Sequence, residues 1–270
     1  MRDERRSVIA STDLARLPTS ATWELAGSAR TTRPWSSPAA RMREFVQAMR
    51  AIWHCWRTGE KLAFEGEFYR HNLMTPMFTP SRTEYGAPGV HVAGVGPLMT
   101  EVAAEVADGM IAHGFTTAKY LEEVTLPAVE RGLKKAGKPR EALDISSPII
   151  AVTGLNEEAF EQSKLAVKSQ LAFYASTPAY RPVLELHGWG DVQTEANRLT
   201  REGRWADMGE LITDEILSTF AVVSEDIEAL PGLLKQRYGH LVDTWQCTVE
   251  TGDRERQAQF IAAVQGTKPS

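Results

Sequence analysis

Between residues 90 and 152 the chain alternates short apolar runs with amphipathic helical patterns, and this alternation constrains the fold more than any other feature. Residues 90–95, 110–113 and 145–152 are apolar runs with the length of buried strands. The segments between them carry apolar side chains at helical spacing, and the second predicts a long helix that Thr117 caps and Gly137 ends. Strands that alternate with helices in this way predict parallel strands joined by right-handed crossovers, so the chain belongs to the α/β class.

Two α/β architectures remain open from this pattern, an open doubly wound sheet and a (β/α)8 barrel. Residues 241–249 alternate as a fourth strand, and four strands are half of what a closed barrel needs. After Tyr174, a stretch of about forty residues rich in Trp, Tyr, His and Gly interrupts the rhythm and is too long for a plain connection. We interpret it as an insertion that covers part of the molecule, followed by helical sequence at residues 195–217.

The part of the chain that precedes the strands predicts a helix and a hairpin. A helix is expected from Ser37, as N-cap, to Gly59, because serine before proline is typical of a helix start and glycine of a helix end. Its apolar face carries Phe45, Trp53 and Trp56, which we expect in the core. The next residues, KLAFEGEFYRH, predict a β-hairpin that turns at Glu-Gly.

Three segments follow from these patterns. Residues 1–33 have no sustained apolar period, and we expect them to be poorly ordered. Residues 34–252 form the folded domain, and residues 253–270 are a polar C-terminal tail.

Charge and cysteine content exclude several functions. Thirty basic and thirty-five acidic residues give a formal net charge of −5, which has the wrong sign for a nucleic-acid-binding protein. The two cysteines, Cys55 and Cys247, have neither disulfide-framework nor zinc-site spacing. The sequence has no apolar stretch of membrane-spanning length and no secretory signal, so we expect a cytoplasmic protein with no membrane partner.

One turn of small residues is the most informative motif. Ala93, Gly94, Val95, Gly96 and Pro97 lead directly from a predicted strand into a predicted helix. Free backbone N–H groups and the positive end of the helix dipole suit such a turn to binding a phosphate. The hydroxyl of Thr100 adds a further donor. A tight strand-to-helix connection without ligand explains the same pattern equally well.

Histidine and aromatic residues supply the other candidate site groups. His113 ends the second strand at the edge of the sheet where ligands bind in parallel folds, and a structural role is the alternative. His91 lies inside its strand and is predicted to be a packing residue. No His, Asp or Glu partner has the spacing of a metal site. The remaining candidates lie in the insertion and are Tyr180, Arg181, His187 and Trp189. They supply an aromatic wall, an anion clamp and a proton donor over a pocket. The alternative is a packing cluster that fixes a long loop.

Two stretches of the chain resemble the luciferase-like monooxygenase superfamily, namely PWSSPAARMREFVQAMRAIWHCWRTGEKLAFEGEFYRH and VHVAGVGPLMTEVAAEVADG. They are most similar to the branch of actinobacterial oxidoreductases that use the deazaflavin coenzyme F420. The resemblance covers residues 34 to about 249 and includes FYASTPAYRPVLELHGWGD, which is similar to that branch's insertion. Residues 1–33 resemble nothing in the family.

The resemblance implies a (β/α)8 barrel of the TIM type that holds coenzyme F420, or alternatively FMN, at the C-terminal ends of its strands. Hydride transfer to or from the coenzyme on a small organic substrate, or oxygen activation with FMN, would then be the reaction. The cofactor would lie on residues 93–97 and Thr100, the catalytic residues would be His113 and His187, and the substrate would meet Tyr180, Arg181 and Trp189.

The family also implies that this barrel is incomplete. In the family the helix that matches residues 37–56 follows the fourth barrel strand, so this chain carries strands 5 to 8 with a helical insertion. A non-catalytic half-barrel that binds or assembles with a partner is therefore the alternative function. A homo-oligomer is one form of such an assembly. A third hypothesis for the function is a barrel that binds phosphate and catalyses a different reaction.

Overall fold

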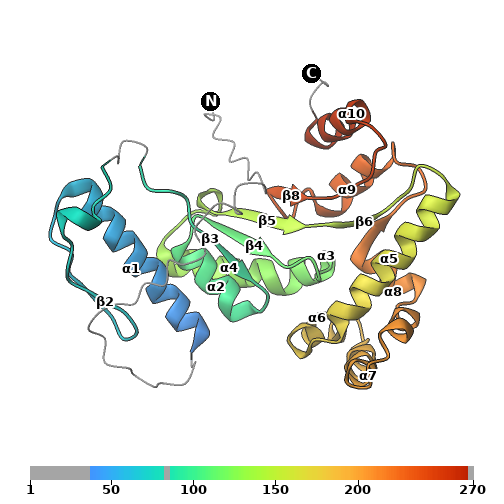
Figure 1. Ribbon diagram of the computed structural model, residues 1–270, viewed down its shortest axis with the longest axis horizontal. Helices are drawn as coiled ribbons and strands as arrows, with labels where there is room; N and C mark the ends of the chain where they lie inside the picture. The colour runs from blue at the N-terminus through green and yellow to red at the C-terminus, as the bar shows by residue number, and fades with distance from the viewer. Residues whose placement is uncertain (1–36, 82–85, 267–270) are drawn as a thin grey trace. The chain divides into compact units, whose positions relative to one another are not determined.

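Four parallel strands lie side by side in the computed structural model, in the order β3-β4-β5-β8 (Figure 1). They are β3 (His91–Gly94), β4 (Gly109–Ala112), β5 (Asp144–Pro148) and β8 (Thr244–Gln246). The strands lie across the sheet in the same order as in the sequence, as they do in a barrel. In a doubly wound sheet this order would reverse at one point. The sheet thus has the arrangement of one half of an eight-stranded barrel. The structure describes residues 37–81 and 86–266, so the expectation for residues 1–33 lies outside it.

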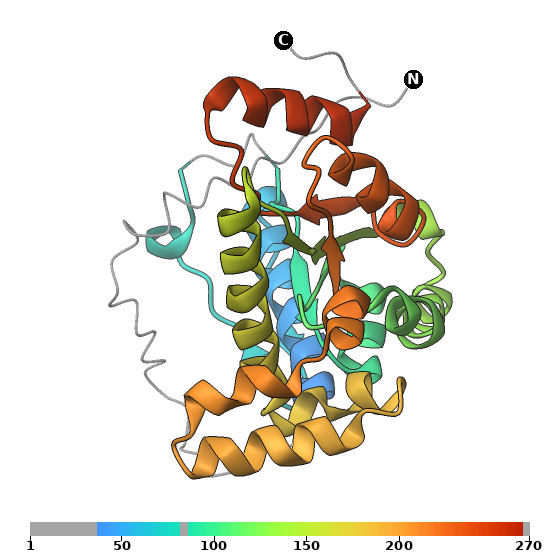
Figure 2. The same cartoon turned by 90° about the vertical axis from the view of Figure 1, so that its right-hand side faces the viewer.

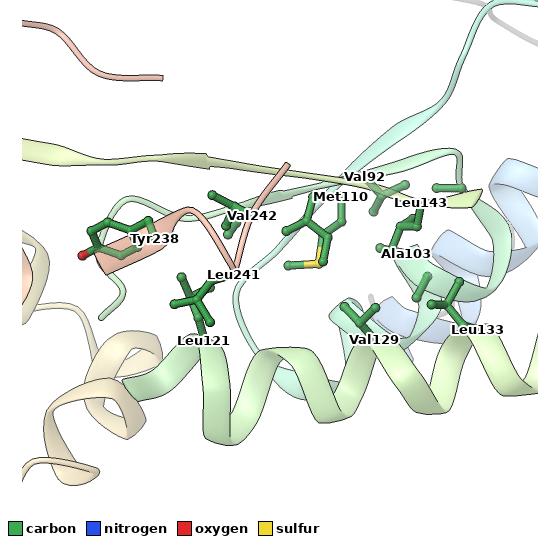
Figure 3. Close-up of a cluster of buried hydrophobic side chains, with 14 of the residues drawn as sticks. Val92, Ala103, Met110, Leu121, Val129, Leu133, Leu143, Tyr238, Leu241 and Val242 are labelled. Atoms are coloured by element: carbon green, nitrogen blue, oxygen red, sulfur yellow. The ribbon is translucent and has the colours of Figure 1, made fainter. Parts of the chain in front are cut away.

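Two helical segments pack on one face of this sheet (Figures 1 and 3). One is α2 (Pro97–Val106), and the other is a continuous helix made of α3 (Ala118–Tyr120), the π-helical η3 (Leu121–Thr125) and α4 (Leu126–Ala136). The buried core between sheet and helices includes Val92, Met110, Val129 and Leu133. Alternate residues of β3, His91 and Ala93, are exposed.

The two helices approach each other closely at Gly132. A Cβ atom at this position would lie 2.1 Å from the carbonyl oxygen of Glu101 and 2.8 Å from the Cβ atom of Ala104. Outside this contact, Glu101 on α2 forms ion pairs with Arg131 and Lys135 on α4. Only glycine therefore permits the observed separation of the two helices. Leu98, near the start of α2, is an apolar residue that is 72% exposed.

The long helix begins and ends where the sequence predicts. Thr117 is its N-cap, with a side-chain oxygen that accepts a hydrogen bond of 3.1 Å from the backbone N–H of Tyr120. Gly137 follows its last residue with φ of 63°. The π-helical turn comes just before Pro127, which donates no N–H and whose ring disfavours a regular helical turn ahead of it.

The helix α1 (Pro38–Thr58) has the predicted bounds, but its start and its exposed face differ from expectation. Ser37 has φ of 59° and its side chain makes no capping hydrogen bond. Phe45 is 46% exposed and packs on Tyr69, so its assignment to the core is wrong. Trp53 and Trp56 are half-buried. The helix packs against α2 on one side, and only part of its apolar face is therefore covered.

The predicted hairpin is confirmed as β1 (Phe64–Glu65) and β2 (Arg70–His71). Its turn is held by a single carboxylate on α1. Glu44 accepts hydrogen bonds from the backbone N–H groups of Glu67, Phe68 and Tyr69 at 2.9, 2.7 and 2.5 Å. A short 3-10 helix, η2 (Pro76–Phe78), follows the hairpin.

A second small parallel sheet joins the main sheet to the insertion. β6 (Ile150–Val152) follows β5 after one residue and pairs with β7 (Ala221–Val223), a strand that the sequence did not predict. The insertion is mainly helical, with α5 packed against α7, η6 and α8 (Figure 2). α5 (Glu157–Ala175) is the helix that precedes the insertion, and the elements of the insertion are η5 (Pro178–Tyr180), α6 (Arg181–Glu185), α7 (Gly190–Arg201), η6 (Trp205–Leu211) and α8 (Asp214–Phe220).

The remaining elements are η4 (Arg140–Ala142), α9 (Leu230–Tyr238) and α10 (Arg254–Gln265). α10 lies in the segment expected as a polar tail, where Asp253 caps it and Gly266 ends it. β8 is shorter than the expected strand 241–249. Among the described residues, no helix has the length and apolarity needed to cross a membrane, and no three His, Cys, Asp or Glu side chains are grouped to hold a metal.

Candidate functional site

The turn after β3 and the loop after β4 lie at the same edge of the sheet, because Gly94 pairs with Ala112 in a parallel register. His113 follows Ala112 directly, so the small-residue turn and His113 occupy neighbouring strand ends. These carboxyl ends of parallel strands are where ligands bind in α/β folds. The structure thus brings together two of the motifs that the sequence singles out.

Local packing explains why residue 94 of the turn is glycine, but it does not explain the glycine at position 96. A Cβ atom at Gly94 would meet the Oγ1 atom of Thr100 at 3.1 Å and its backbone at 3.3 Å, so packing of α2 on β3 favours glycine there. Gly96 is the N-cap of α2, has φ of −97°, and a Cβ atom on it would meet no atom within 4 Å. Neither backbone strain nor packing requires glycine at position 96. The bare backbone and the absence of a side-chain cap leave this helix start open to a ligand.

The other residues predicted around the turn divide into two groups. Ala93, Val95 and Pro97 are at least partly exposed. Thr100 is 1% exposed, because its side chain is buried against Gly94. Its hydroxyl therefore lies beneath the turn, away from the surface that a ligand reaches. A second buried threonine, Thr116 in the loop after β4, has a hydroxyl with no hydrogen-bond partner among the described residues.

His113 is held in one orientation by two hydrogen bonds. The backbone N–H of Phe115 donates to Nδ1 at 3.0 Å, so Nδ1 carries no proton. Nε2 lies 3.1 Å from the hydroxyl oxygen of Tyr180. Burial lowers the pKa of His113 below its usual 6.5, which favours the neutral ring. In the neutral ring the proton is then on Nε2, and this N–H donates to Tyr180.

An aromatic cluster surrounds this pair, and we define it as His113, Phe115, Tyr174 and Tyr180. The ring of Tyr180 stacks on His113 with centroids 4.6 Å apart, and Tyr174 meets the same imidazole edge-on at 5.0 Å. Phe115 is buried against both tyrosines. Sequence reasoning missed Phe115 and Tyr174, whose only signal was that they flank the predicted strand end and the predicted insertion.

His187 anchors the insertion to the start of the long helix. Its Nε2 atom lies 2.9 Å from the hydroxyl of Thr117, and its ring stacks on Trp189 with centroids 4.9 Å apart. Lys119 adds a hydrogen bond of 3.2 Å from Nζ to the carbonyl of Leu186. Burial and the nearby ammonium of Lys119 lower the pKa of His187. The contacts of His187 and Trp189 are those of a packing cluster that fixes a loop.

Arg181 is engaged within the insertion. Its guanidinium donates to Glu185 at 2.6 Å, to the side-chain oxygen of Gln193 at 3.1 Å and to the hydroxyl of Thr194 at 3.0 Å. These bonds tie α6 to α7 and engage Nε and Nη1 of the guanidinium. Two cavities, of about 330 and 410 Å³, lie elsewhere, beside β7 with α9 and between α5 and α8.

Comparison with known proteins agrees with this fold. Residues 21–239 match the model of the family described as luciferase-like monooxygenase. The match begins at residue 21, so the expectation that residues 1–33 resemble nothing in the family is wrong for residues 21–33. Similar curated proteins include an uncharacterised protein of Mycobacterium tuberculosis, 49% identical over 210 residues, which are 78% of this chain and 62% of the relative.

Proteins with assigned activities are also similar. The 5,10-methylenetetrahydromethanopterin reductase of Archaeoglobus fulgidus is 27% identical over 194 residues, covering 70% of this chain and 54% of the relative. An F420-dependent glucose-6-phosphate dehydrogenase of Nocardia farcinica is 36% identical over 105 residues, covering 39% and 29%. The chain therefore spans less than two thirds of the length of these curated relatives.

A solved structure shows the same fold. The coenzyme F420 dependent tetrahydromethanopterin reductase from Methanopyrus kandleri aligns with a TM-score of 0.61 at 16% identity, covering 84% of this chain and 62% of that chain. This chain thus has the fold of part of that larger protein.

Proposed function

Because this chain belongs to the luciferase-like monooxygenase family, whose model matches residues 21–239, we propose that it is an oxidoreductase that works with a deazaflavin of the coenzyme F420 type. Its substrate is a small organic molecule. The name of the similar F420-dependent dehydrogenase supports the choice of coenzyme F420 over FMN. The single observation that carries the proposal in this chain is the open, uncapped turn at Gly96 beside His113.

The residues at this edge fit the phosphate-bearing part of such a coenzyme. The start of α2 presents backbone N–H groups without a side-chain cap, and a Cβ atom at Gly96 would extend into free space. We assign Gly94, Val95 and Gly96 to coenzyme contact through their backbone, with Ala93 and Pro97 shaping the turn. We leave Thr100 out because it is buried. A deazaflavin supplies hydride transfer when it is bound.

The insertion would hold the substrate side of the site. Tyr180 reaches His113 from η5 and is half-buried, so its ring and hydroxyl are available at the sheet edge. His187 and Trp189 fix the insertion on the long helix through Thr117. We therefore assign positioning roles to His187 and Trp189, and a structural role to Arg181.

Titration of the purified 270-residue chain with coenzyme F420 and with FMN tests this function. Saturable binding of one coenzyme, seen by fluorescence and as a raised Tm, is the expected result. Gly96→Val should raise its Kd at least tenfold, which is about 1.4 kcal/mol, with an unchanged Tm of the free protein. Gly232→Val in α9 is the matched control, since a Cβ there also meets nothing within 4 Å. Equal coenzyme affinity in both variants would remove the turn from the site.

One observation favours a second function. β3 and β8 are the edge strands of the four-stranded sheet in the described residues, and open edges of a parallel sheet pair readily with further strands. A non-catalytic half-barrel that assembles with a partner would use these edges. A cooperative melt without binding of either coenzyme, together with a concentration-dependent mass in sedimentation, would favour this second function.

A further inference from the structure

The hydroxyl of Tyr180 has one hydrogen-bond partner among the described residues, and that partner is a donor. Because the Phe115 N–H occupies Nδ1 of His113, the Nε2–H donates to the tyrosine oxygen at 3.1 Å. A phenol oxygen that accepts this bond still carries its own proton. The O–H of Tyr180 is therefore free to donate to a second acceptor at the half-buried edge of the cluster.

We propose that Tyr180 is the residue that donates a proton to an oxygen atom of the substrate, and that His113 is the positioning residue that holds its hydroxyl. The substrate class is then a ketone or aldehyde, or the corresponding alcohol in the reverse direction. This inference rests on the proposed function, whose reduced deazaflavin is the hydride source. It exchanges the roles expected from the sequence, where His113 was catalytic and Tyr180 bound the substrate.

The proton transfer balances as follows. When a carbonyl carbon gains a hydride, the electron pair of the C=O π bond moves to the oxygen. The O–H bond of Tyr180 breaks, an O–H bond forms on the substrate, and the electron pair of the broken bond stays on Tyr180 as a phenolate. The Nε2–H of His113 stabilises this charge by a hydrogen bond. Because Tyr180 is only half-buried, water returns the proton.

The neighbouring Tyr174 shows that the arrangement at Tyr180 is specific. Tyr174 also contacts the His113 ring, but edge-on, and its hydroxyl accepts a long hydrogen bond of 3.4 Å from Gln170 instead of one from the imidazole. Two tyrosines therefore touch one histidine, and only one of them has its hydroxyl oriented by the ring. Tyr174→Phe is consequently the matched control for Tyr180→Phe, since each removes one hydroxyl and keeps the ring.

The first test needs no coenzyme. Long-range ¹H–¹⁵N NMR of the full chain should show His113 as the neutral Nε2–H tautomer at pH 7.5, and an Nδ1–H tautomer would overturn the inference. With [2-¹³C]acetone as probe, the carbonyl signal should move downfield saturably when its oxygen accepts the phenol hydrogen bond. Tyr180→Phe should abolish this movement, and Tyr174→Phe should retain it.

Variants of His113 separate orientation from mere packing. His113→Phe should weaken the acetone response, and His113→Gln should restore it in part because its amide N–H reaches a position similar to Nε2–H. If the wild-type protein shows no acetone response, or Tyr180→Phe keeps it, the proposal is wrong. Failure of coenzyme binding would refute the proposed function while leaving these two readouts intact.

The loaded protein gives a third readout. If acetone reduction is observed with reduced coenzyme F420, Tyr180→Phe should lower kcat by about 100-fold or more, as loss of a general acid does. The Kd for the coenzyme should stay within twofold, and Tyr174→Phe should keep kcat within about threefold. A kcat unchanged in Tyr180→Phe would contradict the assignment.

Discussion

Gly132→Ala is expected to destabilise the protein, although alanine is the better helix former. The new Cβ atom would lie 2.1 Å from the carbonyl oxygen of Glu101, more than 1 Å inside ordinary contact distance. That oxygen belongs to the backbone of α2, so rotation of a side chain cannot relieve the overlap, and α2 and α4 must separate.

The size of the effect follows from two opposing terms. Overpacking of a close helix contact costs about 1–3 kcal/mol, and a rigid backbone partner places this site near the upper end. The gain in helix propensity from glycine to alanine returns about 1 kcal/mol. A net loss of about 1–2 kcal/mol remains, which corresponds to a drop in Tm of about 2–8 °C for a domain of this size.

Urea unfolding and thermal melts followed by circular dichroism measure this loss. Gly232→Ala in α9 is the matched control, because the same change there meets nothing within 4 Å and should be neutral or stabilising. A Gly132→Ala variant as stable as the Gly232→Ala variant would refute the reasoning, since the close approach of α2 and α4 would then carry no energetic weight.

Three further predictions concern other parts of the fold. Burial lowers the pKa values of His113 and His187 below 6.5, so the unfolded chain binds more protons than the folded chain at acidic pH. The free energy of unfolding should therefore fall as the pH drops below 6.5, and it should fall less steeply in His113→Phe. Glu44→Ala should speed amide hydrogen exchange of Glu67, Phe68 and Tyr69 by about tenfold or more, and unchanged exchange would contradict the role of the carboxylate. Burial raises the pKa of the Cys247 thiol to about 11, so a disulfide reagent at pH 8 should label it much more slowly in the native protein than after unfolding, and equal rates would be the opposite result.

Features with a local physical cause could be predicted from the sequence. The ends of the helices at Gly59, Thr117 and Gly137 follow from capping and from positive φ at glycine, which depend on neighbouring residues alone. The turn at Gly96 was found because a run of small residues leads directly into the helix that begins at Pro97. The parallel sheet followed from the alternation of strands and helices.

Features that depend on distant partners could not be predicted. β7 is a strand because β6 pairs with it, and its three residues carry no periodic signal of their own. Phe45 has the spacing of a core residue, yet nothing in α1 says which part of that face α2 covers. The orientation of Tyr180 depends on the Phe115 N–H, which acts through His113. Arg181 is predicted from the sequence as an anion clamp, and its hydrogen-bond partners on α7 were not visible there.

The strand that runs from β5 into β6 belongs to both sheets and is interrupted only at Ile149, whose N–H donates to the carbonyl of Gln246 at 2.8 Å. One continuous segment therefore lines the core of the main sheet and the core of the insertion. The two cores also meet at β7, where Ala221 lies in the core of the insertion and Val222 in the core of the main sheet, so a substitution that loosens one core is expected to weaken the packing of the other.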